Sequence, residues 1–277
     1  MSFSYSFLMS VYLKEKPEQL QIAIESMLKQ TIFPAEIVIV KDGPLPDELN
    51  DVIDNYAKKY TSLFKIIVLE KNSGLGFALQ RGILECSNEF VARMDSDDYS
   101  QPNRMEKQLL EFEKDTELCV CGCFENGFKN DVSNTVWVHT VPERSEDIFH
   151  HMRIRCAMLH PTLVYKKSVI IEVGNYHNVN LFEDYDLLIR IAKNKKKCYN
   201  IQESLYSIRI DDSFYKRRSG IHYLKKSYLF RIKHFKQGFF SLFDLIIAGG
   251  SQTFVCIMPV FIVEFIYKKL LRKKNVR

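Results

Sequence analysis

The sequence has few glycines and prolines, 11 and 8 among 277 residues, whereas 46% of its residues are hydrophobic and 26% are charged. Internal repeats and low-complexity linkers are also missing from it. This composition excludes fibrous and disordered proteins and is sufficient for a full hydrophobic core. We therefore expect one large domain, with or without an appendage.

Paired cysteine motifs are missing as well. The seven cysteines are an odd number and include no C-x-x-C spacing, which argues against a disulfide framework and indicates a reducing compartment. Cys119, Cys121 and Cys123 alternate, and on a regular strand all three thiols would lie on one face. Because no His or fourth Cys stands at ligand spacing, we interpret this face as packing rather than as a metal or redox site.

The chain also lacks a clear signal peptide and a long uninterrupted apolar run. The stretch SFSYSFLMSVYL at the N-terminus has no basic leader or small-residue cleavage site and is interpreted as a buried strand. Residues 239–267 are apolar but are interrupted by Asp244, Pro259 and Glu264. The longest part without a polar or charged residue, residues 254–263, would extend roughly 15 Å as a helix, about half the hydrocarbon thickness of a bilayer.

Charge is distributed unevenly. Residues 1–213 carry 25 basic and 32 acidic side chains, whereas residues 214–277 carry 14 basic and 2 acidic ones. We therefore divide the chain into a globular domain, 1–213, and a basic, aromatic and apolar helical tail, 214–277. The tail favours peripheral attachment to a membrane, in the plane or as a hairpin, over a span or an ordinary packed helix.

Short apolar runs alternate with amphipathic stretches through the first hundred residues. Strands are predicted at 4–12, 36–41, 64–70 and 90–95, and helices begin near Pro17, Pro46 and Leu75. This alternation predicts an α/β fold with a Rossmann-like, mostly parallel sheet flanked by helices. From about residue 101 to 141 a helix is predicted at 104–114 together with short strands, one containing Trp137. Further helices are predicted at 145–152 and 183–192.

Polar residues follow each of the four predicted strands, where ligands of parallel sheets bind. Asp95-Ser96-Asp97-Asp98 places three carboxylates together; they repel one another unless a cation such as a diphosphate-bridging divalent metal lies among them. The alternative is an acidic turn before the helix at Pro102. The candidate ligand-binding residues at the strand ends are Tyr12, Asp42, Asn72, Gly74, Asp95, Ser96, Asp97 and Asp98.

Each of these residues also has a purely structural interpretation. Asp42 could accept a base N–H or form a turn before Gly43, and Tyr12 could stack on a base or pack in the core. The two glycines of Asn72-Ser73-Gly74-Leu75-Gly76 allow a ligand to approach the backbone, although the loop alone is a weak phosphate signature.

An acidic stretch, Glu183-Asp184-Tyr185-Asp186, opens a later helix. It could supply a general base that deprotonates an attacking hydroxyl, or it could only complement the helix dipole. His160 could reach the same cleft or simply end a loop before Pro161. The basic cluster of Lys216, Arg217 and Arg218 could close over a leaving diphosphate or meet phospholipid.

In this order along the chain, the motifs SVYLKE, IVIVKDGPL, EKNSGLGFAL, VARMDSDD and EDYDLLIR resemble bacterial family 2 glycosyltransferases of the GT-A fold. The helix ending in Lys29-Gln30-Thr31 belongs to the same pattern. The resemblance covers residues 4–195 and is closest to the branch that assembles exopolysaccharide, capsule and lipopolysaccharide.

The resemblance implies inverting transfer from a nucleotide-sugar, usually a UDP-sugar, with Mg²⁺ or Mn²⁺. By motif, Tyr12 and Asp42 would hold the nucleobase, Asp95 and Asp97 the ribose and metal, and Asp98 would be a further metal ligand. Asp184 would be the catalytic base with Glu183 beside it. His160 and Asp186 are expected on the acceptor side, and Arg218 near the diphosphate.

Under this resemblance, residues 1–100 form the nucleotide-sugar half and 101–213 the acceptor half. The expected acceptor is a lipid-linked glycan at the cytoplasmic face of the bacterial inner membrane. Lys41 stands where many relatives have an acid, and Leu188 where a Trp is common, which bears on uridine preference and on the acceptor pocket. The Q-x-x-R-W signature of processive synthases is absent, which predicts one sugar per encounter.

Two rival functions remain at the level of sequence. A nucleotidyltransferase shares this kind of core, but the region near residue 10 has no glycine-rich basic loop for a triphosphate. A non-catalytic scaffold at the membrane is disfavoured by the intact acids. Nucleic-acid binding is not expected, because the basic residues cluster with an apolar stretch that suits lipid better.

Overall fold

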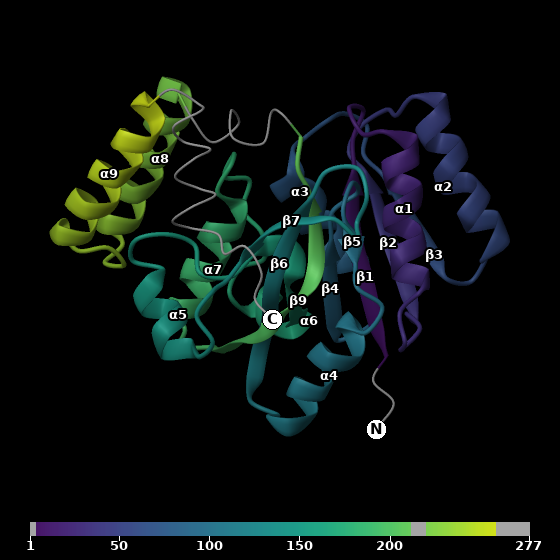
Figure 1. Ribbon diagram of the computed structural model, residues 1–277, viewed down its shortest axis with the longest axis horizontal. Helices are drawn as coiled ribbons and strands as arrows, with labels where there is room; N and C mark the ends of the chain where they lie inside the picture. Colours follow the sequence, from purple (N-terminus) through teal and green to yellow (C-terminus); the bar gives the residue numbers. More distant parts are fainter. Residues whose placement is uncertain (1–3, 212–219, 259–277) are drawn as a thin grey trace.

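The computed structural model describes residues 4–211 and 220–258, and among these residues nine strands form one sheet (Figure 1). The strand order is β3-β2-β1-β4-β8-β6-β9-β5, with β7 paired to β6. The strands are β1 (Tyr5–Val11), β2 (Glu36–Lys41), β3 (Phe64–Val68), β4 (Phe90–Met94), β5 (Tyr99–Ser100), β6 (Leu118–Phe128), β7 (Thr135–His139), β8 (Val164–Lys166) and β9 (Lys197–Arg209).

Helices cover both faces of the sheet (Figure 1). The α-helices are α1 (Pro17–Leu28), α2 (Asp47–Lys59), α3 (Leu75–Glu85), α4 (Arg104–Lys114), α5 (Ser145–His151), α6 (Lys167–Glu172), α7 (Glu183–Lys193), α8 (Gly220–Lys236) and α9 (Leu242–Ile257), and a short 3₁₀ helix spans His160–Thr162.

The first half of the sheet is parallel, as the alternation of strands and helices predicts. Strand β1 pairs in parallel with β2 and β4, and β2 with β3. The four strands begin and end within two residues of their predicted bounds. Because all four run the same way, the loops after their carboxyl ends meet at one edge.

The second half of the sheet is mixed. Strand β8 runs antiparallel to both β4 and β6, β6 runs parallel to β9, and β9 runs antiparallel to β5. Strand β6 has 11 residues and is longer than the short strands expected between residues 101 and 141, whereas β9, with 13 residues, was not predicted. The prediction of a mostly parallel sheet is therefore confirmed for β1 to β4. Beyond β4 the strands pair in both orientations.

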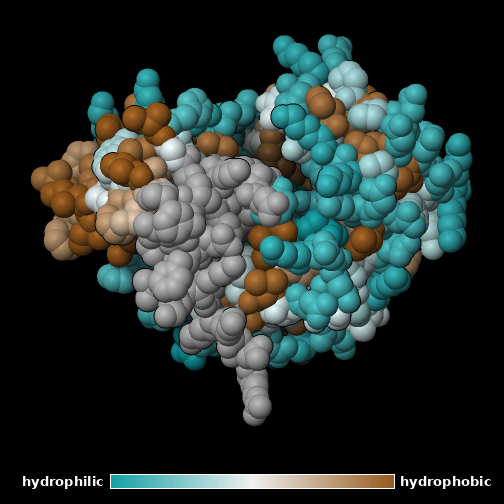
Figure 2. Space-filling view, turned by 45° about the horizontal axis from the view of Figure 1, so that its top comes forward, coloured by the Kyte–Doolittle hydropathy of each residue, from teal (hydrophilic) through white to brown (hydrophobic). Residues whose placement is uncertain are grey.

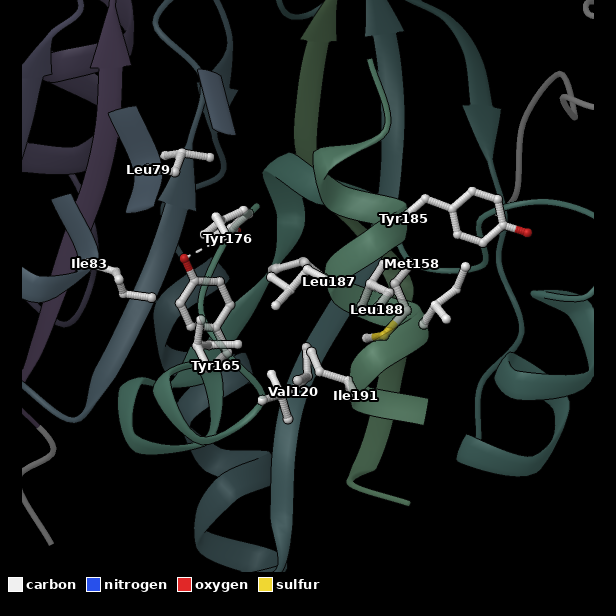
Figure 3. Packing of buried hydrophobic residues seen from close by; sticks show 14 of the residues in the cluster. Leu79, Ile83, Val120, Met158, Tyr165, Tyr176, Tyr185, Leu187, Leu188 and Ile191 are labelled. Atoms are coloured by element: carbon white, nitrogen blue, oxygen red, sulfur yellow. Dashed lines mark hydrogen bonds between the residues drawn. The ribbon is translucent and has the colours of Figure 1, made fainter. Parts of the chain in front are cut away.

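Alternating residues of the central strands face two separate core layers. In β1, Phe7 and Met9 pack in the layer under α1, α2 and α4, whereas Leu8 packs in the layer that holds α3 and α7. In that second layer, Leu187 and Ile191 of α7 lie among the buried residues drawn in Figure 3. Helix α7 is thus anchored by its apolar face, and its acidic N-terminus stays near the loops of the sheet.

All seven cysteines are free thiols. The expectation that Cys119, Cys121 and Cys123 share one face is wrong for Cys119. A register shift between Leu118 and Val120 interrupts the alternation, and Cys119 packs against the layer of α3 and α7 while the other two lie in the opposite layer. Their role is packing, as interpreted from the sequence.

The C-terminal residues that the structure describes form a helical hairpin, α8–α9, beside α5 and α7 (Figure 1). Its residues Phe230, Phe239 and Phe240 belong to the same buried cluster as α7. In the described parts of the chain, no helix has the length and hydropathy that crossing a membrane requires. The predicted boundary at 213/214 and the basic cluster with Arg218 lie outside the described residues.

Candidate active site

Four loops meet where the parallel strands end. Tyr12, Asp42 and Asp95 directly follow β1, β2 and β4, and residues 72–74 connect β3 to α3. Tyr12 and Asp95 are half-buried, Asp42 is buried and Asn72 is exposed. The strand order brings these predicted site residues to one edge of the sheet.

Asp42 ties two of these loops together. Its carboxylate oxygens accept hydrogen bonds from the backbone N–H groups of Ser73, at 2.7 Å, and Gly74, at 3.0 Å. Gly43 makes this approach possible, because a Cβ there would lie 2.5 Å from the backbone nitrogen of Asn72 and its φ is +88°. Charge-assisted bonds of this kind fix the loop before α3.

The acidic cluster after β4 contains two buried side chains, Ser96 and Asp98, and two half-buried ones, Asp95 and Asp97. The Oδ1 atom of Asp98 accepts a 2.8 Å hydrogen bond from the backbone N–H of Arg209. Its Oδ2 atom is buried without a hydrogen-bond partner. Burial, together with the charges of Asp97 and Asp95, raises the pKa of Asp98 well above its usual range.

This donor set fits a divalent cation. Carboxylate oxygens are the ligands that Mg²⁺ and Mn²⁺ prefer, and a bound cation would supply the partner that Oδ2 of Asp98 does not have. Within residues 4–211 and 220–258, no three His, Cys, Asp or Glu side chains are grouped so that they could hold a metal ion by themselves. One or two carboxylates suffice, however, when substrate phosphates complete the coordination.

Two arginines near the cluster escaped the sequence reasoning. Arg93 is fully buried in β4 and forms an ion pair with Asp95. Arg209, the last residue of β9, donates from Nε to the carbonyl oxygen of Asp97 over 2.9 Å. A charged residue inside the apolar run of β4 was a readable signal for Arg93, whereas nothing local distinguishes Arg209.

The acidic pair at the start of α7 lies close to the loop after β3. A Cβ built on Gly76 would lie 2.7 Å from the carbonyl oxygen of His177 and 3.2 Å from Cβ of Glu183. Asn178 reinforces this contact by donating from Nδ2 to the carbonyl oxygen of Ser73 over 3.3 Å. The segment that leads into α7 therefore packs directly on the loop that Asp42 holds.

The environment of Glu183 changes its protonation. Burial and the neighbouring charge of Asp184 raise the pKa of Glu183 to about 7, against an opposing effect of Arg93. Asp184 is half-buried, and its Oδ1 accepts a 2.7 Å hydrogen bond from the N–H of Tyr185. Glu183 also responds to the charge of Asp95, so the two acidic groups share one electrostatic environment.

His160 is enclosed in the core. Its Nε2 lies 2.9 Å from the hydroxyl of Tyr176, and its side chain is 8% exposed. Burial and the charge of Arg93 lower the pKa of His160 well below its usual range, which keeps the ring neutral. This burial disagrees with the expected contact between His160 and an acceptor.

Asp186 does not face the cleft either. Its side chain is 1% exposed, and its carboxylate is surrounded by basic side chains from α7, the preceding loop and α8. It joins elements of the protein to one another, and this geometry disagrees with the expected position on the acceptor side.

The two departures from the family pattern have structural explanations. Lys41 turns toward α2, where its Nζ lies 2.9 Å from Oδ1 of Asn50 and 3.5 Å from Oδ1 of Asp54, away from the loop that Asp42 holds. Leu188 is buried in the core layer of α3 and α7, so it does not line an open acceptor pocket.

Comparisons with known proteins identify the family and the fold of the chain. The family Glycosyl transferase family 2 matches residues 6–169. An Escherichia coli UDP-Gal:alpha-D-GlcNAc-diphosphoundecaprenol beta-1,3-galactosyltransferase is 34% identical over 269 residues, covering 97% of each chain. The amylovoran biosynthesis glycosyltransferase AmsE of Erwinia amylovora is 34% identical over 272 residues, covering 96% of this chain and 98% of its own.

A solved structure shows the same fold. The mannosyltransferase PcManGT from Pyrobaculum calidifontis, in complex with GDP-Man and Mn²⁺, has a TM-score of 0.61 at 12% identity, covering 91% of this chain and 69% of its own. The matching family and both relatives are glycosyltransferases, which overturns the nucleotidyltransferase and scaffold alternatives. The chain belongs to glycosyl transferase family 2 and is a glycosyltransferase of the GT-A fold.

Proposed function

We propose that this enzyme transfers one sugar per encounter, with inversion, from a UDP-sugar to a hydroxyl of a lipid-linked glycan during cell-surface polysaccharide biosynthesis. The observation that carries the proposal is the approach of two acidic groups to one sheet edge. Packing at Gly76 brings the acidic pair of α7 against the loop held by Asp42. The charge of Asp95 contributes to the raised pKa of Glu183.

The donor would lie over the ends of the parallel strands. Asp42 and the loop at residues 72–74 form the base-binding end, with the ring of Tyr12 beside them as a stacking surface. Lys41 contacts Asn50 and Asp54 of α2, so Asp42 is the residue proposed to bind the base. A UDP-sugar is favoured because UDP-Gal is the donor named for the Escherichia coli relative.

Asp97 and Asp98 would hold the divalent cation, with Asp95 and Ser96 on the donor side. A cation bound there supplies positive charge for the departing nucleoside diphosphate. The protein's own part is to hold these carboxylates in place, through Arg209 on Asp98 and Arg93 on Asp95. Arg218 stays a candidate for the diphosphate on sequence grounds alone.

Asp184 is proposed to take the proton from the acceptor hydroxyl as the hydroxyl attacks the anomeric carbon. The raised pKa of Glu183 supports a shared role, since Glu183 is partly protonated near neutral pH and lies beside Asp184. Fixed groups lower the barrier by orienting this proton transfer.

The acceptor end faces a lipid surface in this proposal. The Escherichia coli relative is named for a diphosphoundecaprenol acceptor. Apolar side chains gather on the surface of the α8–α9 hairpin (Figure 2). Phe243, Ile246 and Ile257 of α9 are 69%, 65% and 74% exposed. An exposed apolar surface in a basic segment favours attachment to the cytoplasmic leaflet, whose lipids are anionic.

Ligand binding and turnover test the catalytic part. The wild type is titrated with UDP, GDP, CDP and ATP, each with and without Mn²⁺, and thermal stabilisation is followed. We expect stabilisation by UDP that depends on Mn²⁺ and is lost in Asp97→Ala. Stabilisation by GDP or CDP alone would overturn the UDP assignment.

Turnover is measured with a panel of UDP-sugars that includes UDP-galactose, on a synthetic GlcNAc-diphospho-lipid. Asp184→Asn should bind UDP normally and transfer no sugar, and the wild-type product should contain one added sugar with inverted anomeric configuration. Normal turnover of Asp184→Asn would reject it as the base, and Glu183→Gln, measured in parallel, would then show whether its neighbour acts instead.

Flotation with phosphatidylglycerol-containing vesicles tests the lipid-facing hairpin. Ile246→Glu should reduce co-flotation, because a charge on the apolar face is costly to bring against acyl chains. Ile22→Glu is the matched control, since Ile22 is 38% exposed on α1. Equal losses for the two variants would argue against docking through the hairpin.

A further inference from the structure

The carboxylate of Asp186 is the meeting point of four basic side chains. Its Oδ2 lies 2.9 Å from both Nδ1 of His177 and Nε of Arg190, and its Oδ1 lies 2.9 Å from Nζ of Lys233 and 3.2 Å from Nε2 of His234. Burial alone would raise the pKa of Asp186, but His234, Lys233 and Arg190 bring it below its ordinary value. The group is therefore ionised and fully engaged.

The four partners come from three parts of the chain. Arg190 lies on α7 itself, His177 on the loop before it, and Lys233 and His234 on α8. A single buried carboxylate thus joins the catalytic helix to the C-terminal hairpin. Separating α7 from α8 would leave the buried charge of Asp186 without Lys233 and His234, which is energetically costly. The cluster therefore favours one arrangement of α7 and α8.

Aromatic side chains on both sides of the acidic pair reach the same hairpin. Phe182 stacks on Phe230 with ring centroids 4.8 Å apart and planes 21° apart, and contacts Tyr223 at 5.6 Å. Tyr185 lies 5.2 Å from Phe230. Residues 182, 185 and 186 are thus held by α8, and the two acids lie between the first two.

The start of α7 has little local support of its own. Phe182 occupies the N-cap position and makes no side-chain capping hydrogen bond, and the preceding Leu181 has a φ of +75°. Helix starts are normally fixed by a Ser, Thr, Asp or Asn cap. Here the fixation comes from packing against α8 and against the loop at Gly76.

We propose that α8 holds the catalytic helix in place and that Asp186 is a positioning residue, which docks α8 on α7 and thereby orients Glu183 and Asp184. This proposal rests on the proposed function of the acidic pair. As a consequence, the hairpin surface that is proposed to contact lipid is rigidly connected to the catalytic helix α7.

The test compares Asp186→Asn with wild type in the full chain. We expect kcat to fall at least about tenfold, since small misplacements of catalytic groups cost that much, while KM for the donor and UDP affinity with Mn²⁺ stay within about twofold. Hydrogen exchange of the backbone amides at residues 183–187 should increase. Asp115→Asn, which breaks the 2.6 Å ion pair with Lys197, is the matched control and should change none of these quantities.

Changes on the α8 side separate positioning from other roles. Lys233→Gln combined with His234→Gln should lower kcat in the same way, and adding Asp186→Asn should cost little more, because all three act through one contact. This variant also serves if Asp186→Asn fails to fold. Unchanged kcat in the α8 variant would overturn the proposal, and a loss with Asp186→Asn alone would return Asp186 to the acceptor side.

A wild type that transfers no sugar to the acceptor would refute the proposed function, whereas the exchange measurement would still report on docking. Unchanged exchange in Asp186→Asn would overturn the docking role whatever the activity. An equal loss of UDP binding and kcat would show general destabilisation and would also reject positioning.

Discussion

Asp42 uses both carboxylate oxygens to hold the backbone of the loop that follows β3. At the residue scale, the group expected to recognise the base is therefore also the group that shapes the loop. Each oxygen keeps a second lone pair, so loop support and base recognition are compatible.

Asp42→Asn is expected to weaken UDP binding about tenfold and to lower the free energy of unfolding by about 1–2 kcal/mol, because an amide has only one acceptor oxygen for two N–H donors. Isothermal titration with UDP and urea unfolding measure the two effects. Asp51→Asn, on the exposed side of α2, is the control and should change neither. Wild-type affinity in Asp42→Asn would contradict a role at the base.

Glu183 is expected to make stability depend on pH. Its pKa is about 7 in the folded protein and lies near its ordinary value of 4.5 in the unfolded chain. The folded state then binds the proton more tightly, so stability falls as pH rises from about 4.5 to 7.

Glu183→Gln removes this pH dependence. The free energy of unfolding of the variant should exceed that of wild type by about 3 kcal/mol at pH 8 and by less than about 1 kcal/mol at pH 5. Urea titrations at both pH values measure the difference. An equal gain at pH 5 and pH 8 would contradict burial of the charge as the cause.

At the scale of elements, α3 and the segment before α7 approach so closely that only glycine fits at residue 76. Gly76→Ala should push this segment away and reduce kcat/KM for the donor about tenfold or more. Gly250→Ala on α9 is the matched control, because nothing lies within 4 Å of its added methyl group, and it should leave activity unchanged. Steady-state kinetics with a UDP-sugar measure kcat/KM for both variants, and equal values for Gly76→Ala and wild type would contradict the prediction.

Elements in the first half were predictable because each buries an unmistakable apolar run between turn signals. The four strand ends, and hence Asp42 and the Asp95–Asp98 cluster, followed from this pattern. Strand β9 was not predicted, because its residues 197–209 include Lys197, Asn200 and Glu203 and do not alternate cleanly. Pairing within a mixed sheet depends on contacts distant in sequence, which periodicity does not report.

The position of Asp186 could not be predicted for the same reason. Together with Glu183 and Asp184, it forms a group of three acids within four residues, which is typical of the start of a helix. The sequence therefore indicated one acidic surface. Its partners Lys233 and His234 lie 47 and 48 residues away. Only the tertiary structure shows that it points toward α8 and away from the cleft.

At the scale of the whole molecule, the hairpin and the α/β domain share one hydrophobic core. Unfolding followed by the fluorescence of the single tryptophan, Trp137 in β7, should therefore coincide with unfolding followed by far-UV circular dichroism. Phe230→Ala should shift both transitions together by about 3 kcal/mol. Phe243→Ala, at an exposed position of α9, should shift neither. Separate transitions would show that the hairpin unfolds on its own.

The packing of α8 against α7 has a consequence for synthesis of the chain. The ribosome releases residues 220–240 after the entire sheet, yet these residues complete the core around Phe182 and Tyr185. A nascent chain can thus assemble its parallel strands early and acquire an ordered catalytic helix only at the end of translation. Limited proteolysis of ribosome-stalled chains tests this delay. We expect cleavage within residues 183–193 as long as residue 240 is still inside the ribosome, and protection once it has emerged. Activity would then begin only when the hairpin has been released.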